Sequence, residues 1–205
     1  DHLYLHSFPT RRSSDLTEIE LERDISFLHK YFGGTGDSFH PIVAFDKNSC
    51  MPHSTPTNKR LEKNNVVMLD FGTEYKGLCS DITRMFFFGS VESKILVLHS
   101  ILKDLVEQIA AELKSGIAVK DLDLFARSSL RKVKLEKYFV HSLGHGIGFQ
   151  IHQSPRISIY SEEILKENQI ITIEPGVYFE NRFGLRVENM YLIKNNSAIN
   201  LTNFE

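Results

Sequence analysis

Two aspartates interrupt stretches of the sequence that otherwise have the character of β-strands. Asp70 ends the apolar run of residues 66–69, and Asp81 opens residues 82–88, which are rich in strand-forming types. A carboxylate inside such a run is costly unless it is paired, protonated or bound to a cation. Because a hairpin-like turn separates the runs, the two acids can face each other across adjacent strands, where a proton or a metal ion would relieve their repulsion. For either aspartate alone, the simpler interpretation is that it caps a turn.

Three further side chains extend this pair into a possible metal site. Glu174 follows the apolar run 170–173, Glu188 lies in the middle of the alternating stretch 184–194, and His145 lies in a glycine-rich segment. Four carboxylates and one imidazole favour Mn²⁺, Fe²⁺ or Co²⁺ over a closed zinc site built on thiolates. Four negative charges call for roughly two divalent ions. Two such ions about 3.5–4 Å apart share a water and lower its pKa, which is hydrolytic chemistry.

Other histidines lie near these candidates. His141 and His152 flank His145 on a segment with three glycines in five positions, which we expect to be a flexible frame whose backbone comes close to another part of the molecule. His53 lies in a proline-containing loop over residues 48–58. Taken alone, each of these three is more simply a loop or core histidine.

The elements that must position these residues are expected in the order helix, strands, helix, helix, followed by further strands. Thr17 followed by Glu20 predicts the start of a helix, and Gly33 and Gly34 would end that helix. Apolar periodicity predicts two later helices, and short loops predict antiparallel strands. The predicted helices are residues 91–115 and 121–137, and the predicted strands are residues 42–45, 66–70, 82–88, 170–173, 177–179 and 184–194. This order is α+β.

Composition sets broad limits. The 205 residues are 41% hydrophobic with a net charge of −2, which suits one packed domain and gives no nucleic-acid footprint. No apolar run is long enough to span a membrane, so we expect no membrane contact. Two unclustered cysteines indicate a reducing compartment, and we expect a cytoplasmic protein.

The first residues differ in character from the rest. Residues 1–16, DHLYLHSFPTRRSSDL, have no lasting period and no signal-peptide core, and they resemble a translated sequencing adapter. We expect them to be foreign, with a disordered natural tail as the alternative. An upstream part of the natural protein would then be missing.

Five motifs, in order, resemble those of one enzyme family. They are PHSTPT, LDFGTEYKGLCSDITRMF, HSLGHGIGFQIHQSP, ITIEPGVYF and GLRVENM. Residues 17–205 resemble the catalytic domain of the pita-bread metallopeptidases, which include methionine aminopeptidases, Xaa-Pro aminopeptidases and prolidases. The motif GLRVENM favours the Xaa-Pro branch, because methionine aminopeptidases usually have a Gln-Phe-Glu-like motif there. The resemblance implies a curved antiparallel sheet with flanking helices.

The resemblance also implies a role for each candidate ligand. Asp70 would chelate one ion, Asp81 and Glu188 would bridge both, His145 would bind the second, and Glu174 would complete the set and carry the proton. A metal-bridging hydroxide would attack the peptide carbonyl that precedes proline. The implied cofactor is two divalent ions per chain, with manganese expected and cobalt, iron or zinc as alternatives.

Further residues match the surroundings of the family's metal site. His53, His141 and His152 would bind the substrate or donate hydrogen bonds to the tetrahedral intermediate. Arg186 would hold the carboxylates, and Tyr178 would lie nearby. Departures from the family pattern are mild: Ser142 replaces a usual glycine, Asn189 a common aspartate, and Gln153 a common glutamate.

Two alternatives remain open. One is a methionine aminopeptidase. The other is a non-catalytic pita-bread protein that binds peptides, although relatives of that kind have lost ligands. The expected partner is a proline-containing peptide. Because Xaa-Pro enzymes usually carry an N-terminal domain that helps to form the dimer, we expect that domain to be missing here and the full-length protein to be a homodimer.

Overall fold

The computed structural model describes residues 16–203. Helix α1 (Glu18–Tyr31) begins as predicted: the Thr17 hydroxyl accepts from the Glu20 backbone N–H (3.2 Å), and the Glu20 carboxylate accepts from the Thr17 N–H (3.0 Å). This reciprocal capping satisfies two otherwise unpaired donors of the first turn. The prediction for residues 1–16 concerns a segment of which all but Leu16 lies outside the described residues.

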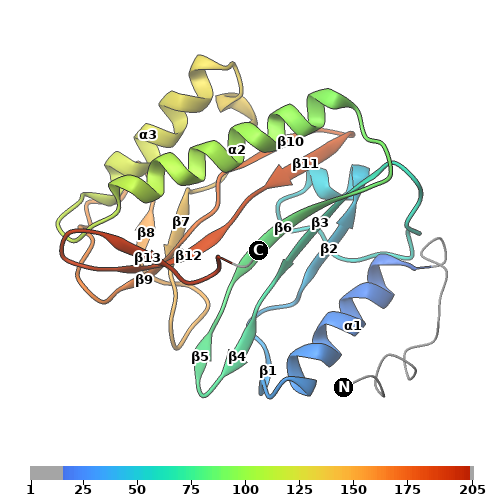
Figure 1. The fold of residues 1–205 in the computed structure, drawn as a ribbon, viewed down its shortest axis with the longest axis horizontal. Coiled ribbons are helices and arrows are strands. Elements are labelled where there is room, and N and C mark those ends of the chain that lie inside the picture. Colours follow the sequence, from blue (N-terminus) through green and yellow to red (C-terminus); the bar gives the residue numbers. More distant parts are fainter. Residues whose placement is uncertain (1–15, 204–205) are drawn as a thin grey trace.

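A three-stranded antiparallel sheet contains the predicted hairpin. Its order is β2 (Ile42–Phe45), β3 (Asn65–Phe71), β6 (Ile82–Phe88). Strands β3 and β6 pair over seven residues each. At the tip of the hairpin, a smaller sheet joins β1 (Gly36–Asp37), β4 (Thr73–Tyr75) and β5 (Leu78–Cys79). Helix α1 lies beside this part of the molecule (Figure 1).

A second antiparallel sheet holds the later strands. Its order is β13 (Ala198–Asn200), β12 (Asn189–Ile193), β9 (Ile170–Ile173), β7 (Gly144–Gly146), β8 (Gln153–Ile157). Strands β10 (Gly176–Phe179) and β11 (Phe183–Arg186) form a separate antiparallel ribbon. Short 3₁₀ turns, η2 (Asp46–Cys50) and η3 (Glu136–Tyr138), connect elements around this ribbon.

Two helices pack against these strands. Helix α2 (Ser93–Glu112) runs along the ribbon, with α3 (Val119–Lys132) beside it (Figure 1). Their apolar stripes join the main core, in which Leu102, Ile109 and Leu130 have no exposed surface. A smaller core lies under α1, where β3 contributes Val67 and, partly buried, Leu69. Alternate residues of β3 therefore serve two cores, as the strand period of two requires. The expected α+β architecture is confirmed.

The predicted helix over residues 121–137 has different bounds. It begins at Val119 and ends at Lys132. Lys134 adopts a left-handed φ of 63°, the Leu135 N–H donates to the Leu130 carbonyl, and the Lys134 N–H donates to the Arg131 carbonyl. This is a Schellman ending, in which an apolar residue beyond the helix folds back. Leu135 thus continues the apolar pattern after the helix has ended.

The predicted single strand over residues 184–194 is wrong. It is divided into β11, which pairs with β10, and β12, which pairs with β9. Val187 and Glu188 lie between the two strands. Their backbone N–H groups donate to Pro175 and Thr83 instead of to a strand partner. Glu188 therefore lies where the chain leaves one sheet for the other.

Within the described range 16–203, every helix is too short or too polar to cross a membrane.

Candidate metal centre

Strands β3 and β6 place two of the predicted ligands on one face. Asp70 pairs with Thr83 across the ladder, and Asp81 precedes β6 directly, opposite Gly72 if the register is continued. The two aspartates therefore do not oppose each other directly but lie two positions apart on the same face. The backbone at Gly72 is tightly enclosed, because a Cβ there would lie 1.8 Å from the Ser80 carbonyl oxygen. Only glycine fits at this point of the hairpin.

His145 lies on a strand, not on a flexible frame as predicted. It is the central residue of β7, which pairs with β8 and β9. A Cβ at Gly144 would lie 2.1 Å from the Thr172 carbonyl oxygen, and a Cβ at Gly146 would lie 2.3 Å from that of Ser154. The glycines do bring the backbone close to its neighbours, as expected. Their effect is to fix His145 in a tightly packed sheet.

The predicted ligands converge. Asp81, His145 and Glu188 each offer a ligand atom within 4.8 Å of the others. The His145 Nε2 atom lies 3.4 Å from Asp81 Oδ2 and 3.6 Å from Glu174 Oε1. Side chains from both sheets therefore meet at one point, as the sequence predicts for a metal site.

The carboxylates of Asp70 and Glu188 are each oriented through one oxygen only. Arg186 donates to Asp70 Oδ2 (2.5 Å) and, through Nε, to the Thr83 hydroxyl (2.9 Å). Thr83 in turn donates to Glu188 Oε2 (2.8 Å). The second oxygens, Asp70 Oδ1 and Glu188 Oε1, are buried and have no hydrogen-bond partner among the described residues.

Such orphaned oxygens are the main structural sign of a cation. Buried polar atoms in folded proteins are nearly always paired. A carboxylate is suited to bind a metal ion when one of its oxygens accepts a hydrogen bond and the other has no hydrogen-bond donor. The residues present therefore fit the divalent ions that the sequence implies. Thr83 was missed by sequence reasoning, although a threonine inside the run 82–88 is a polar break in an apolar stretch.

The charges at the centre repel one another. Burial raises the pKa of Asp81 to about 6, with Asp70 adding to the effect, and burial raises the pKa of Glu174 to about 7. Burial, with Asp81 and Glu174 adding, raises the pKa of Glu188 well above its usual range. Burial opposes the charging of His145, but Asp81 and Glu174 outweigh it and raise the pKa of this imidazole. Without a cation, the cluster therefore retains protons that a metal ion would displace.

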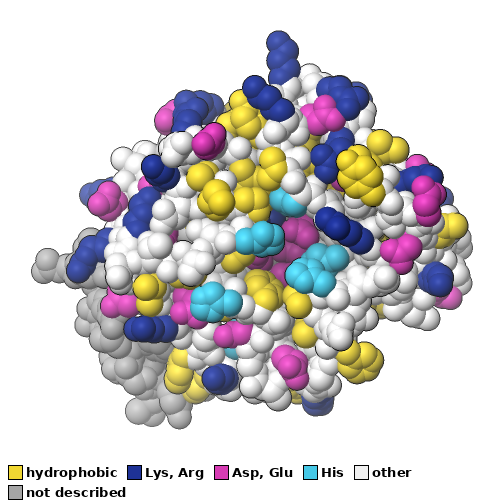
Figure 2. Space-filling view, turned by 180° about the vertical axis from the view of Figure 1, so that it is seen from behind, with side chains coloured by type: hydrophobic (Ala, Val, Ile, Leu, Met, Phe, Trp, Pro, Cys, Tyr) yellow, Lys and Arg dark blue, Asp and Glu magenta, His cyan; other side chains and the backbone are white. Residues whose placement is uncertain are grey.

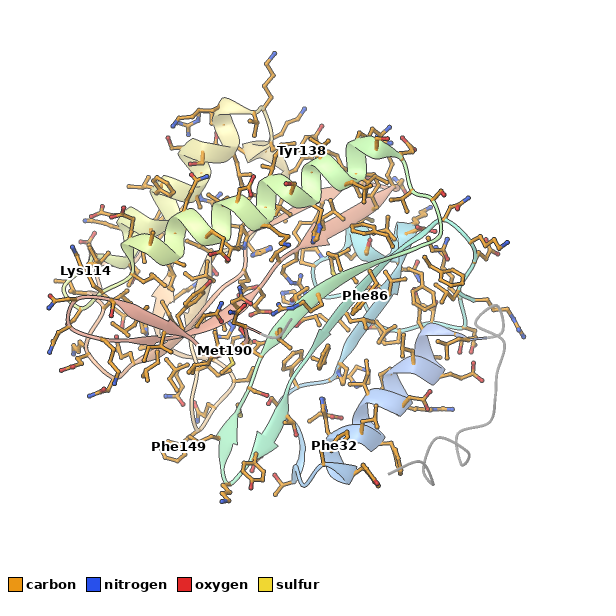
Figure 3. All side chains as sticks on the ribbon, viewed as in Figure 1. Phe32, Phe86, Lys114, Tyr138, Phe149 and Met190 are labelled. Atoms are coloured by element: carbon orange, nitrogen blue, oxygen red, sulfur yellow. The ribbon has the colours of Figure 1, made fainter. Side chains whose placement is uncertain are left out.

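Two cavities open onto the cluster. A cavity of about 890 Å³ has Pro52, Phe149 and Arg156 in its lining, and one of about 320 Å³ has the four acids in its lining. The residues common to both linings are His53, His145, His152 and Glu174. Figure 2 shows histidine side chains gathered around an acidic patch in the middle of this face. Phe149, which is 79% exposed, projects near the tip of β5 (Figure 3). A peptide-sized space thus leads to the acids.

His141 is held differently from the other two histidines. Its Nδ1 lies 2.8 Å from the Ser142 carbonyl oxygen and its Nε2 lies 2.9 Å from the Tyr178 hydroxyl. Because Arg186 donates to that hydroxyl (2.7 Å), the tyrosine can donate to Nε2, which assigns the His141 proton to Nδ1. Burial, with Arg186 adding, lowers the pKa of His141 to about 4, and burial raises the pKa of Tyr178 to about 12. His141 is therefore neutral, and both of its nitrogens are engaged. Donation from His141 to a substrate, as predicted, would require this network to rearrange.

His53 and His152 face the cavities freely. Within residues 16–203, neither ring has a hydrogen-bond partner. The His152 ring lies edge-on to that of His145, with centroids 4.5 Å apart. Burial, with His145 and His53 adding, lowers the pKa of His152. Both rings are thus available to a bound molecule.

Arg84 is a second residue that sequence reasoning missed. It donates to the Glu188 carbonyl (2.5 Å), the Thr202 carbonyl (2.8 Å) and the Asn189 side-chain oxygen (2.9 Å). It therefore fixes the backbone at Glu188 from behind the centre. In the sequence, Arg84 simply follows Thr83 in a strand, and nothing there indicates that it contacts the residues around Glu188.

Comparison with known proteins agrees with this geometry. An Xaa-Pro dipeptidase of Pyrococcus furiosus is 37% identical over 195 residues, covering 93% of this chain and 56% of that protein. The solved structure of the prolidase from Pyrococcus furiosus matches with a TM-score of 0.92 at 36% identity, covering 95% of this chain and 58% of that one. That of the X-Pro aminopeptidase from Thermotoga maritima matches with a TM-score of 0.91 at 34% identity, covering 94% and 55%. The chain thus spans a little over half the length of these relatives.

The family assignment rests on most of the chain. The sequence profile of metallopeptidase family M24 matches residues 4–195. Together with the antiparallel sheets and flanking helices, and the solved structures they match, this identifies the pita-bread fold. The chain belongs to metallopeptidase family M24.

Proposed function

We propose that this chain hydrolyses the peptide bond that precedes a proline, with two divalent metal ions. The observation that carries the proposal is the pair of orphaned oxygens on Asp70 and Glu188. These two residues line a cavity of about 320 Å³ together with Asp81, His145 and Glu174, and the last two also line the cavity of about 890 Å³. A structural metal site would be closed, whereas this cluster is open to a space that can hold a peptide.

Five residues would hold the metal ions: Asp70, Asp81, His145, Glu174 and Glu188. When bound, divalent ions supply Lewis-acid polarisation of a carbonyl and lower the pKa of a water. Asp81 and Glu188 would be central members of this set, as the sequence resemblance implies. Manganese remains the expected metal, with cobalt, iron or zinc as alternatives.

The protein's own groups bind, orient and move protons. Glu174 belongs to the linings of both cavities, so its carboxylate can accept a proton on the metal side and release it on the substrate side. His53 and His152 can donate hydrogen bonds to the carbonyl that is attacked. Arg186 and Thr83 hold the carboxylates in place, while Tyr178 joins Arg186 to His141.

The preference for proline rests on the relatives and on the motif around Glu188. The names of the similar proteins refer to Xaa-Pro dipeptidase and X-Pro aminopeptidase activities. The motif GLRVENM lacks the Gln-Phe-Glu-like pattern of methionine aminopeptidases. The non-catalytic alternative is disfavoured because all five candidate ligands are present and line one cavity. We also propose that residues 17–205 form the catalytic domain and that the full-length protein is a homodimer.

The test compares substrates and metal conditions on the whole chain. We expect cleavage of an Ala-Pro dipeptide or a longer Xaa-Pro peptide with Mn²⁺, and none with a chelator or in the Asp81→Ala variant, which should remain folded. Cleavage of a Met-Ala-Ser peptide but of no proline peptide would instead indicate a methionine aminopeptidase. Full activity of Asp81→Ala would contradict the metal assignment. Peptide binding without cleavage, and without bound metal, would support the non-catalytic alternative.

A further inference from the structure

Helix α1 contributes a fully buried carboxylate that lies outside the metal centre. The Glu18 side chain has no exposed surface. Its Oε1 accepts from the Phe45 N–H (2.6 Å), and its Oε2 accepts from the Thr57 N–H (2.9 Å) and the Thr57 hydroxyl (2.6 Å). The Asn48 amide donates to both oxygens (3.1 and 2.9 Å). No lysine or arginine pairs with Glu18 within residues 16–203. The charge is therefore held by neutral donors and by the N-terminal end of α1.

These donors all lie at or near the two ends of a single segment of the chain. Phe45 precedes residues 46–57, Asn48 lies near the start of that segment, and Thr57 ends it. We name these residues the His53 segment. It supplies Pro52 and His53 to the larger cavity and His53, Ser54 and Thr55 to the smaller one. Glu18 thus fastens both ends of the segment that forms one wall of the candidate site.

The first half of the His53 segment has contacts of its own: Asp46 accepts from the Val66 N–H (2.7 Å), and η2 packs against β11. The Pro52 carbonyl accepts from Arg186 Nη1 (3.2 Å), and the Ser49 hydroxyl bonds the backbone of Gly184. The His53 ring itself is exposed and has no partner in the described part of the chain. The position of the ring therefore depends on the backbone to which it is attached. Asp46 and Ser49 help to hold the start of that backbone, and the Glu18 side chain contacts both of its ends.

We propose that Glu18 is a positioning residue that holds the His53 segment against the metal centre, so that His53 is presented to the peptide substrate. The contact of His53 with a peptide rests on the proposed function. The hydrogen bonds by which Glu18 holds the His53 segment do not depend on it. Glutamine is the informative replacement because it keeps the shape of the side chain. An amide nitrogen cannot accept a hydrogen bond, so either Phe45 or Thr57 would face a donor instead of an acceptor. The backbone bonds from Glu18 and Ile19 to Lys59 and Thr57 (3.1 and 3.2 Å) would remain.

The matched control is Thr17→Ala. Thr17 is the neighbouring residue, and its hydroxyl caps the same helix without contacting the His53 segment. It should lower the stability of α1 as a lost cap does, while leaving the segment in place. Both variants would be compared with the parent chain in amide hydrogen exchange, in bound Mn²⁺, and in kcat and KM on an Xaa-Pro peptide.

We expect Glu18→Gln to accelerate exchange in residues 46–57 by at least about tenfold, with exchange in α2 and the Mn²⁺ content unchanged. KM should rise severalfold, more than kcat falls, and Thr17→Ala should show neither change. Parent-like exchange and KM in Glu18→Gln would overturn the proposal, as would equal changes in Thr17→Ala. If Glu18→Gln does not fold, Thr57→Val is the alternative: it removes the hydroxyl that donates to Glu18 and that also accepts from the Asn48 amide and the Lys59 N–H (3.1 Å each). It should give a smaller change of the same kind, and no change would again overturn the proposal. If the parent chain does not cleave the peptide, the proposed function fails, and the exchange data still decide whether Glu18 holds the segment.

Discussion

The replacement of Arg127 by methionine should destabilise the protein far more than the same change at Arg131, one turn further along α3. Arg127 donates to the fully buried Asp123 (3.1 Å), to the Phe139 carbonyl (3.2 Å) and to the His141 carbonyl (2.7 Å). Its guanidinium lies 4.6 Å from the centroid of the Phe139 ring. Among the residues that the structure describes, Arg131 pairs only with Glu136 at the surface, where it is 69% exposed.

The loss of stability in Arg127→Met can be estimated from the hydrogen bonds that Asp123 would keep. Asp123 would retain one donor, the Ile159 N–H (2.9 Å), and its Oδ1 already has no partner within the described range. Removing one member of a buried ion pair costs about 3–5 kcal/mol. Because Arg127 is 21% exposed, water can partly replace it, so we take the lower value of about 3 kcal/mol. In a domain of this size, that loss lowers Tm by about 6–12 °C.

The assay is thermal unfolding of both variants by circular dichroism, at the same metal concentration. Arg131→Met should melt close to the parent chain. Asp123→Asn, added to Arg127→Met, should recover part of the loss because the stranded charge is then removed. Equal Tm values for the two single variants would show that the pairing of Arg127 with the buried Asp123 does not stabilise the protein.

Three other changes should have distinct effects. His152→Ala should lower kcat by a large factor at unchanged Mn²⁺ content, and a loss of bound metal would instead make His152 a ligand. In the metal-free protein, the pKa values of Asp81 (about 6) and Glu174 (about 7) lie above their ordinary 3.8 and 4.5, so the folded state binds more protons and its stability should fall as pH rises from about 4 to about 7. Urea unfolding with a chelator measures this trend, which excess Mn²⁺ should reverse, and rising stability without metal would contradict it. Gly144→Ala places a Cβ 2.1 Å from the Thr172 carbonyl oxygen and should cost roughly 1–3 kcal/mol and weaken Mn²⁺ binding, whereas parent-like Tm and metal content would be inconsistent with the packing of β7.

Local sequence patterns were sufficient where one face of an element is buried. The start of α1 follows from Thr17 and Glu20, and strands β2 and β9 have the predicted bounds because apolar residues dominate both. The four acidic candidate ligands could be identified because acids are rare inside such runs, whereas His145 was indicated by its glycine-rich segment. These residues come together, however, only because the two sheets meet at one point. No local sequence pattern predicts that contact between the sheets.

Three features of the structure could not be predicted from the sequence, each for a physical reason. Residues 184–194 keep one alternating pattern although the chain changes partner at Glu188, because both strands bury the same kinds of side chain. Strand β7 contains two glycines, which usually mark a loop, and here the lack of Cβ atoms is what lets the strands approach. Glu18 is an acid in the first turn of a helix, where exposed acids are common, so sequence alone does not distinguish it from Glu20.

We propose that the orphaned oxygens of Asp70 and Glu188 bind metal ions. The most direct measurement is the number of Mn²⁺ ions bound per chain in equilibrium dialysis, for the parent chain and for Glu188→Gln. We predict two ions per parent chain, and a loss of bound metal in Glu188→Gln with the fold retained by circular dichroism. A folded parent chain that binds no Mn²⁺, Co²⁺, Fe²⁺ or Zn²⁺, or a Glu188→Gln variant that still binds two ions with unchanged affinity, would contradict it.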